Sequence, residues 1–272
     1  MSRDELELAL TWAAQEGWNP GLRDAECFYA ADPDGFLIGY LGQEPVGCIS
    51  VVRYGPSFGF LGFYIVRPER RGCGYGHRLW QAGMERLGGC TVGLDGVVAQ
   101  QDNYRRSEFV LAHRNIRFGG APGCERPSDP RLRPIGSELV DAVIHYDRRF
   151  FPAERGSFLR CWLQPRRREG RALVEDGAVR GYGVVRACRT GSKIGPLFAE
   201  TEEGADLLFR ALAAAASRTP VFLDCPEPNR TATALAAGYG LSPVFETARM
   251  YRGPAPDLSL SRVYGITTFE LG

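Results

Sequence analysis

Residues 66–76 read VRPERRGCGYG and join an apolar strand pattern to an amphipathic helix pattern. The strand pattern occupies residues 59–66, and the helix pattern places Leu79, Trp80 and Leu87 on one face. Glycines let a backbone approach a ligand closely, and free N–H groups at a helix N-terminus bind anions such as pyrophosphate. The sequence therefore predicts a phosphate-binding turn built from backbone amides.

Two other kinds of phosphate-binding loop do not fit this turn. A P-loop needs a Lys after its last glycine, and no Lys follows Gly76. A dinucleotide-binding turn needs the spacing G-x-G-x-x-G, whereas Gly72, Gly74 and Gly76 give G-x-G-x-G. Asp95 could imitate the acidic ribose ligand of such a turn, which lies about 20 residues on. The glycine spacing nevertheless disfavours a nucleotide-binding oxidoreductase.

The composition of the 272-residue chain favours a globular protein with a small-molecule partner. Hydrophobic residues make up 44% of the chain, enough to bury a core in each of about two domains. The 33 Lys and Arg residues nearly balance 32 Asp and Glu residues, which leaves a net charge of +1. This balance gives no reason to expect nucleic acid or an anionic membrane as a partner.

Cysteine usage indicates the compartment. The eight cysteines are spread widely without a C-x-x-C pair, and the chain has three His residues. This pattern is typical of buried free thiols in a reducing compartment rather than of a zinc site or a disulfide framework. Residues 1–17 lack the basic start and apolar block of a signal peptide, and no charge-free stretch approaches the roughly 20 apolar residues of a membrane span. We therefore expect a soluble cytoplasmic protein without a bound metal.

One order of α/β elements occurs twice along the chain. In the first half the patterns predict a helix at 4–15, an irregular polar segment at 16–35, strands at 36–41, 46–53 and 59–66, a helix after residue 76 and a strand at 91–97. In the second half they predict strands at 172–175, 179–186 and 193–199, a helix at 203–217 and a strand at 220–225. Residues 119–130 are rich in Gly and Pro and predict a linker. We expect an α/β fold with mixed sheets in two tandem domains, 1–118 and 131–272.

The pattern Val-x-Pro-x-x-Arg-Arg-x-x-Gly-x-Gly of the turn closely resembles the coenzyme A loop of the GNAT superfamily of N-acetyltransferases. Arg71, Gly74 and Gly76 occupy the fixed positions of the family signature [QR]-x-x-G-x-[GA]. The resemblance implies two tandem GNAT-like domains, of which the first carries the complete loop. By element order it covers residues 1–118 in the first half.

A second motif of the same family resembles residues 103–109. In the family an Asn-containing loop precedes a helix that ends in Tyr-x-x-x-Gly-Phe, and here Asn103, Tyr104 and Phe109 are similar to its Asn, Tyr and Phe. Glu108 stands where Gly is usual, and Asn103 directly precedes Tyr104 instead of lying a full helix earlier. The resemblance therefore implies a short helix at this place.

The resemblance implies direct transfer of an acetyl group from acetyl-CoA to a primary amine in a ternary complex, without an acyl-enzyme. The strand at Tyr64, Ile65 and Val66 would pair with the pantetheine arm. The pyrophosphate would contact the backbone of the turn, at Arg71, Gly72, Cys73, Gly74, Tyr75 and Gly76, and the family pattern adds Asn103 to the cofactor site. A phenol placed near sulfur can protonate the departing thiolate, and Tyr104 is our candidate for this acid.

Further side chains are candidates for the base and for contacts with the acceptor. Asp95, on the strand beside the cofactor strand, and Asp24 and Glu26, after the first helix, could each take the proton of the attacking amine directly or through water. Asp24 and Glu26 follow the first helix, where the family builds a wall of the acceptor site, and Trp18 and Asn19 of the same segment could touch the acceptor. The acceptor is a small-molecule amine or a peptide amine; the sequence does not distinguish them.

The second half lacks the features that hold the cofactor in the first half. Residues 195–204 occupy the place of the glycine turn without G-x-G spacing, and Glu200, Glu202 and Glu203 would repel a pyrophosphate. Asn229 begins a helix similar to that of the family, but Ala236 replaces its Tyr. We expect a degenerate second domain whose sheet is closed by residues 243–253 and 263–272. A non-catalytic acyl-CoA-binding or sensing protein is the alternative to an acetyltransferase.

Overall fold

The computed structural model describes residues 1–164 and 168–272 and contains the same order of elements twice. The first repeat, residues 3–120, contains α1 (Arg3–Gln15), α2 (Asp24–Ala31), β1 (Phe36–Leu41), β2 (Glu44–Tyr54), β3 (Phe58–Val66), α3 (Tyr75–Arg86), β4 (Thr91–Val97), α4 (Gln101–Arg106) and β5 (Val110–Gly120). The second repeat, residues 137–252, contains α5 (Ser137–Asp147), α6 (Gly156–Trp162), β7 (Glu169–Glu175), β8 (Ala178–Ala187), β9 (Ser192–Ala199), α7 (Glu202–Ala215), β10 (Val221–Pro226), α8 (Arg230–Gly238) and β11 (Ser242–Arg252). Short elements lie at β6 (Leu132–Pro134), β12 (Val263–Gly265) and the 3₁₀ turns Pro68–Arg70, Val98–Gln100 and Leu260–Arg262. The tandem α/β fold with a mixed sheet is confirmed.

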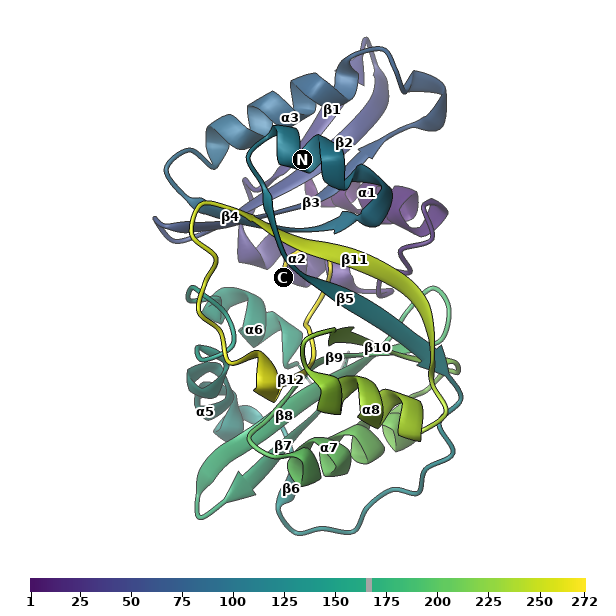
Figure 1. The fold of residues 1–272 in the computed structure, drawn as a ribbon, viewed down its shortest axis with the longest axis vertical. Helices are drawn as coiled ribbons and strands as arrows, with labels where there is room; N and C mark the ends of the chain where they lie inside the picture. Colours follow the sequence, from purple (N-terminus) through teal and green to yellow (C-terminus); the bar gives the residue numbers. More distant parts are fainter. Residues whose placement is uncertain (165–167) are drawn as a thin grey trace.

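One continuous sheet joins the two repeats, with β5 and β11 at its centre (Figure 1). Its strand order is β1-β2-β3-β4-β11-β5-β10-β9-β8-β7-β6, and β12 pairs with β9 off this path. From β1 to β7 the order is palindromic, because each strand of one repeat has its counterpart equally far from the centre. Each repeat therefore places its last strand against the fourth strand of the other: β11 pairs with β4, and β5 pairs with β10.

This exchange corrects the expectation that residues 243–253 close the second sheet. β11 pairs with β5 over most of its length and with β4 from Thr247 to Arg252. Ala248 and Met250 are fully buried in the cluster under the first repeat. The residue pattern predicted the strand correctly, but the partner of a long strand is decided by contacts far along the chain.

The expectation of an irregular segment at 16–35 is also wrong in part, because these residues include α2. This helix buries Ala25, Cys27 and Phe28 and packs on α6, where the Phe28 ring stacks on Trp162 at 6.3 Å between centroids. The two helices occupy equivalent places in the two repeats, so the hydrophobic core is continuous across them.

A disulfide joins Cys27 of α2 to Cys161 of α6, with the Cα atoms 5.2 Å apart. The expectation of free thiols throughout is therefore wrong for these two residues, since an eight-residue and a seven-residue helix bring them together from 134 positions apart. The remaining cysteines are free, and Cys48, Cys188 and Cys225 are buried. Among the described residues, no helix combines the length and the hydropathy needed to cross a bilayer.

Candidate functional site

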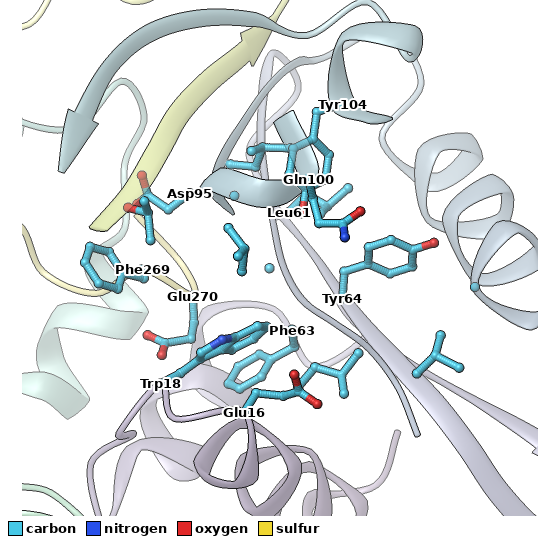
Figure 2. Close-up of a pocket in the computed structure, with 18 of the residues that line it drawn as sticks. Glu16, Trp18, Leu61, Phe63, Tyr64, Asp95, Gln100, Tyr104, Phe269 and Glu270 are labelled. Atoms are coloured by element: carbon cyan, nitrogen blue, oxygen red, sulfur yellow. The ribbon is translucent and has the colours of Figure 1, made fainter. Parts of the chain in front are cut away.

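A cavity of about 470 Å³ lies where β3 and β4 diverge. The two strands pair in parallel only from Phe58 with Thr91 to Leu61 with Leu94, and beyond that point each continues without pairing to the other. The cavity is lined by β3, β4, the 66–77 turn, α4 and Trp18 of the first repeat, and by Phe245 and Thr247 of β11. Figure 2 shows the aromatic and carboxylate side chains around it. Because the strands separate here, the backbone of β3 is accessible to a ligand along the cavity.

The backbone of β3 is irregular beside the cavity. Cys48 pairs with Ile65 and Ser50 with Gly62, so β3 holds one more residue than β2 over this interval. Phe63 within it has a φ of 45°, a left-handed conformation that is strained for a residue with a side chain. A bulge of this kind leaves backbone groups without a strand partner. Such groups are available as hydrogen-bond donors or acceptors for a bound molecule.

The glycine turn forms the entrance to α3. Gly72 and Gly74 have φ values of 77° and 81°, and Gly74 is the residue before the first turn of the helix. A Cβ on either residue would meet no atom within 4 Å, so the space over the turn is open. The four N–H groups of the first helical turn and these glycine amides make this a place for an anion. Gly72, Gly74 and Gly76 line the cavity.

Arginine side chains of the turn hold its shape. Arg71 donates from Nε to the Val66 carbonyl at 2.9 Å and forms an ion pair with Glu16 at the end of α1. Arg67 and Arg70 both bind the Glu44 carboxylate, at 2.7 and 2.6 Å. Cys73 is exposed and Tyr75 is half-buried, and neither lines the cavity.

Tyr104 lies in α4 and lines the cavity. The helix is six residues long, in agreement with the short helix expected. The Tyr104 ring stacks on Trp80 of α3 at 5.8 Å and lies against Gly96, where a Cβ would come within 2.2 Å of the ring. Burial, and next the nearby Tyr64 phenol, raise the pKa of Tyr104 to about 12. Tyr104 therefore stays protonated at neutral pH and can donate a proton or hydrogen bond.

Two further cofactor-strand residues line the same cavity, and one expected residue does not. Ile65 and Val66 lie along its β3 wall with Tyr64, whose ring packs on Trp80 at 5.4 Å. Asn103 is exposed on α4, where its Nδ2 donates to Gln100 Oε1 at 2.6 Å. It is Gln100, rather than Asn103, that reaches the cavity beside Tyr104 (Figure 2).

Asp95 lines the cavity but is held in an ion pair. Arg249 of β11 donates to both of its carboxylate oxygens, at 2.8 and 2.6 Å, and Asn115 Nδ2 donates at 2.8 Å. The Asp95 side chain is fully buried. Burial raises the pKa of Asp95, and the charge of Arg249 offsets part of that rise. A carboxylate occupied in this way is a poor proton acceptor, which argues against our expectation of a catalytic base here.

Of the residues after α1 that we expect near the acceptor, some line the cavity and others make contacts elsewhere. Trp18 lines the cavity. Asn19 instead exchanges hydrogen bonds with the backbone of Thr190, both at 2.9 Å, in the second repeat. Glu26 forms an ion pair with Arg3 at 3.5 Å.

Asp24 lies outside the cavity lining, in the contact between the repeats. It pairs with Arg168 at 3.1 Å and Arg186 at 3.2 Å, and the Gly21 N–H donates to it at 2.9 Å. Burial alone would raise the pKa of Asp24, but the guanidinium groups of Arg186 and Arg168 hold it below its ordinary value. The expectation that Asp24 binds an acceptor is corrected, because these cations already surround it.

The segment 266–272 supplies two lining residues that the sequence patterns did not predict. Phe269 and Glu270 reach the first-repeat cavity although they follow β12 of the second repeat. A Cβ on Gly62 would lie 2.2 Å from the Glu270 carbonyl oxygen, so the glycine permits the segment to press against β3. The only sequence signal was a carboxylate within the apolar run ITTFELG.

In the second repeat, β12 of the same chain occupies the space between β9 and β10, and a pocket lined by Glu200, Asn229 and Arg262 remains beside it. Like β3 and β4, the strands β9 and β10 pair only over a short stretch, here of three residue pairs, and then diverge. Beyond that point β12 pairs with β9, and the Ile266 N–H donates to the Asp224 carbonyl at 2.9 Å. Asn229 Nδ2 fixes β12 by donating to the Val263 carbonyl at 2.9 Å. At the place of the glycine turn, Glu200 forms ion pairs with Arg149 and Arg262.

The geometry of the first cleft therefore suits an extended ligand with an anionic end. Backbone groups line one wall, amides at a helix N-terminus lie at one end, and a phenol projects from α4. In the part of the chain that the structure describes, no cluster of three or more His, Cys, Asp or Glu side chains could hold a metal ion.

Comparisons with known proteins agree with this geometry. Residues 3–109 match the acetyltransferase (GNAT) family, and residues 143–265 match an acetyltransferase (GNAT) domain. The chain is 32% identical to holothin acyltransferase of Pseudoalteromonas sp. (strain SANK 73390), over 100% of this chain and 92% of that protein. Fold and site define a tandem acyltransferase. The chain belongs to the GNAT family.

Solved structures show the same fold at low sequence identity. A protein of Pyrococcus horikoshii superposes with a TM-score of 0.83 at 23% identity, covering 100% of this chain and 94% of that one. A tandem GNAT protein from the clavulanic acid biosynthesis pathway superposes with a TM-score of 0.62 at 16% identity, over 94% and 98% of the two chains. The tandem arrangement is therefore shared with other solved proteins.

Proposed function

We propose that this acyltransferase moves an acetyl group from acetyl-CoA to the primary amine of a small-molecule acceptor, by direct attack in a ternary complex. The observation that carries the proposal is the difference between the two clefts. The first is open and ends at glycine amides, whereas the second contains β12 and a paired Glu200. We assign the chemistry to residues 1–118 and the completion of the acceptor site to residues 131–272, with 119–130 as linker.

The cofactor would lie along β3. The pantetheine arm would pair with Tyr64, Ile65 and Val66, and the pyrophosphate would bind the amides of Arg71 to Gly76. The bulge at Phe63 supports a place for the thioester carbonyl, because backbone groups freed from the ladder can bind an oxygen on which charge develops. Asn103 is exposed and does not line the cavity, so the structure does not support its expected part in cofactor binding.

The reaction forms one bond and breaks one bond. The amine nitrogen attacks the thioester carbon, the new C–N bond forms, and the C–S bond breaks to release the thiolate of coenzyme A. Tyr104 supplies the proton for this sulfur and regains one from water. With a pKa of about 12 it is protonated at every pH at which such an enzyme works.

Two observations support a small acceptor. The acceptor side of the cavity is bounded by Trp18, Phe245 and Phe269, which leaves an aromatic-walled chamber rather than an open groove. The acyltransferase that is 32% identical over the whole of this chain is named for holothin, so holothin is the first acceptor to test.

A direct assay tests the proposal. Purified full-length chain is incubated with acetyl-CoA and a panel containing holothin, a polyamine, an aminoglycoside and an amino-terminal peptide, and free coenzyme A and acetylated product are measured together. Turnover with one small amine supports the proposal. Binding of acetyl-CoA without any product would favour the sensing alternative for this site, and turnover with the peptide alone would overturn the small-molecule acceptor.

We propose a cytoplasmic location, which the free state of the other six cysteines supports, three of them buried. The Cys27–Cys161 disulfide is unusual for this location, because disulfides are rare in reducing compartments.

A further inference from the structure

Glu270 reaches the cavity at the bulge of β3. Its carbonyl lies against Gly62, the neighbour of Phe63 in the strand, and its side chain lines the cavity. Figure 2 shows Glu270 and Phe269 along one side of the cavity, across from Tyr64. The side chain thus lies on the side where Trp18 bounds the acceptor chamber.

The segment that carries Glu270 is firmly held. Tyr54 Oη donates to the Leu271 carbonyl at 3.1 Å, and Arg155 Nη1 donates to the Gly272 carbonyl at 3.1 Å. Within the segment, the Leu271 N–H donates to Thr268 Oγ1 at 3.0 Å. Three hydrogen bonds therefore fix the backbone of Leu271 and Gly272, directly after Glu270.

Among the described residues, Glu270 differs from the other two carboxylates of the cavity wall in having no ion-pair partner. Glu16 pairs with Arg71, and Asp95 pairs with Arg249. Glu270 is 3% exposed, makes no ion pair within 4.0 Å across residues 1–164 and 168–272, and its Oε1 is buried without a hydrogen-bond partner there. A buried carboxylate oxygen left unmatched is costly, and a ligand that donates to it removes the cost.

Charged groups face Glu270 from several elements without contacting it. They are Lys193 of β9, Asp24 of α2, Arg117 of β5 and Arg186 of β8. Burial raises the pKa of Glu270; the three cations oppose the rise and Asp24 adds to it. A carboxylate with a raised pKa is a stronger proton acceptor than an exposed one.

We propose that Glu270 is the general base of the first repeat, accepting the proton that the acceptor amine loses as it attacks the thioester. The inference rests on the proposed function. The amine nitrogen gives its proton to the Glu270 carboxylate while the C–N bond forms, and Glu270 then passes that proton to water. Tyr104 independently protonates the sulfur, so the products are one amide and one coenzyme A thiol. The second repeat thus supplies a catalytic group to the site of the first.

The test compares Glu270→Gln with Glu202→Gln, a matched change at an exposed carboxylate in the first turn of α7. Acetyl-CoA binding is measured by calorimetry, and kcat and KM with acetyl-CoA and holothin from pH 5 to 9. We expect Glu270→Gln to bind acetyl-CoA as the wild type does and to lose about 10²-fold or more in kcat. It should also lose the acid limb of the wild-type pH profile. Glu202→Gln should match the wild type.

Two outcomes would overturn the proposal, and they are distinguishable from failure of the proposed function. Glu270→Gln with kcat within twofold of wild type, or with the acid limb intact, removes Glu270 as the base while the transferase function stands. A wild-type chain that binds no acetyl-CoA and forms no product overturns both. If Glu270→Gln does not fold, Glu270→Asp replaces it. Retention of the acid limb with a lowered kcat then supports the proposal, and loss of that limb without loss of kcat contradicts it.

Discussion

Asp95 of β4 and Arg249 of β11 form a two-point ion pair that ties the cleft of the first repeat to the last strand of the second. The Arg249 guanidinium also lies 5.1 Å from the centroid of the Phe60 ring, and Asn115 of β5 binds the same carboxylate. Three strands of the central sheet therefore meet at Asp95, which makes it a structural link between the repeats.

Asp95→Asn should destabilise the protein, because it leaves the buried Arg249 without a countercharge. Breaking one partner of such a pair typically costs about 3 kcal/mol or more. In chemical denaturation, Asp95→Asn should have a lower midpoint than the wild type. The control Asp102→Asn, at an exposed ion pair with Arg105, should have the wild-type midpoint. Unchanged stability of Asp95→Asn would contradict the structural role.

Gly74→Asp should abolish acetyl-CoA binding without unfolding the protein. The turn has open space at this position, so the new carboxylate would stand where the pyrophosphate must bind. Gly240→Asp is a matched control, because Gly240 also has a positive φ of 75° and open space but follows α8 in the second repeat. Normal acetyl-CoA affinity of Gly74→Asp in calorimetry would refute the assignment of the turn.

Tyr104→Phe should retain acetyl-CoA binding and lower kcat by roughly 10²-fold, the usual size of one lost proton-transfer group. Because burial holds the Tyr104 pKa at about 12, the wild type should show no loss of activity from this group below about pH 11. Tyr239→Phe, which removes a phenol next to α8, is the control. Equal kcat in Tyr104→Phe and wild type would reduce Tyr104 to a packing residue.

Much of this site could be predicted from sequence, because its signals are local. The glycine turn, the strand before it and the short helix with Tyr104 each depend on residues within about ten positions. The ion pair of Asp95 could not be predicted in this way, because its partner Arg249 lies 154 positions away and no local pattern indicates the pair.

Local patterns also could not predict the exchange of β5 and β11 or the path of segment 266–272, because the contacts that decide them lie far apart along the chain. A strand pattern fixes alternation of side chains and leaves the partner strand open. The short helices α2 and α6 were likewise hidden, since their apolar faces pack mainly on each other.

The Cys27–Cys161 disulfide predicts a specific thiol count. Titration of unfolded, unreduced protein should find six free thiols, and peptide mapping should recover the 27–161 cross-link. Cys27→Ala should lower the free energy of unfolding by about 2–4 kcal/mol under non-reducing conditions. Reduction of both proteins should remove most of this difference. Eight free thiols in protein isolated with alkylation from cells would show that the bond is absent there.

The occupation of the two clefts is tested most directly by isothermal titration of the full chain with acetyl-CoA. One molecule should bind per chain, because the first cleft is open at the glycine turn and β12 occupies the second. Gly74→Asp should reduce this stoichiometry from one to zero. Two molecules per chain, or one molecule still bound to Gly74→Asp, would contradict the assignment of acyl transfer to the first repeat.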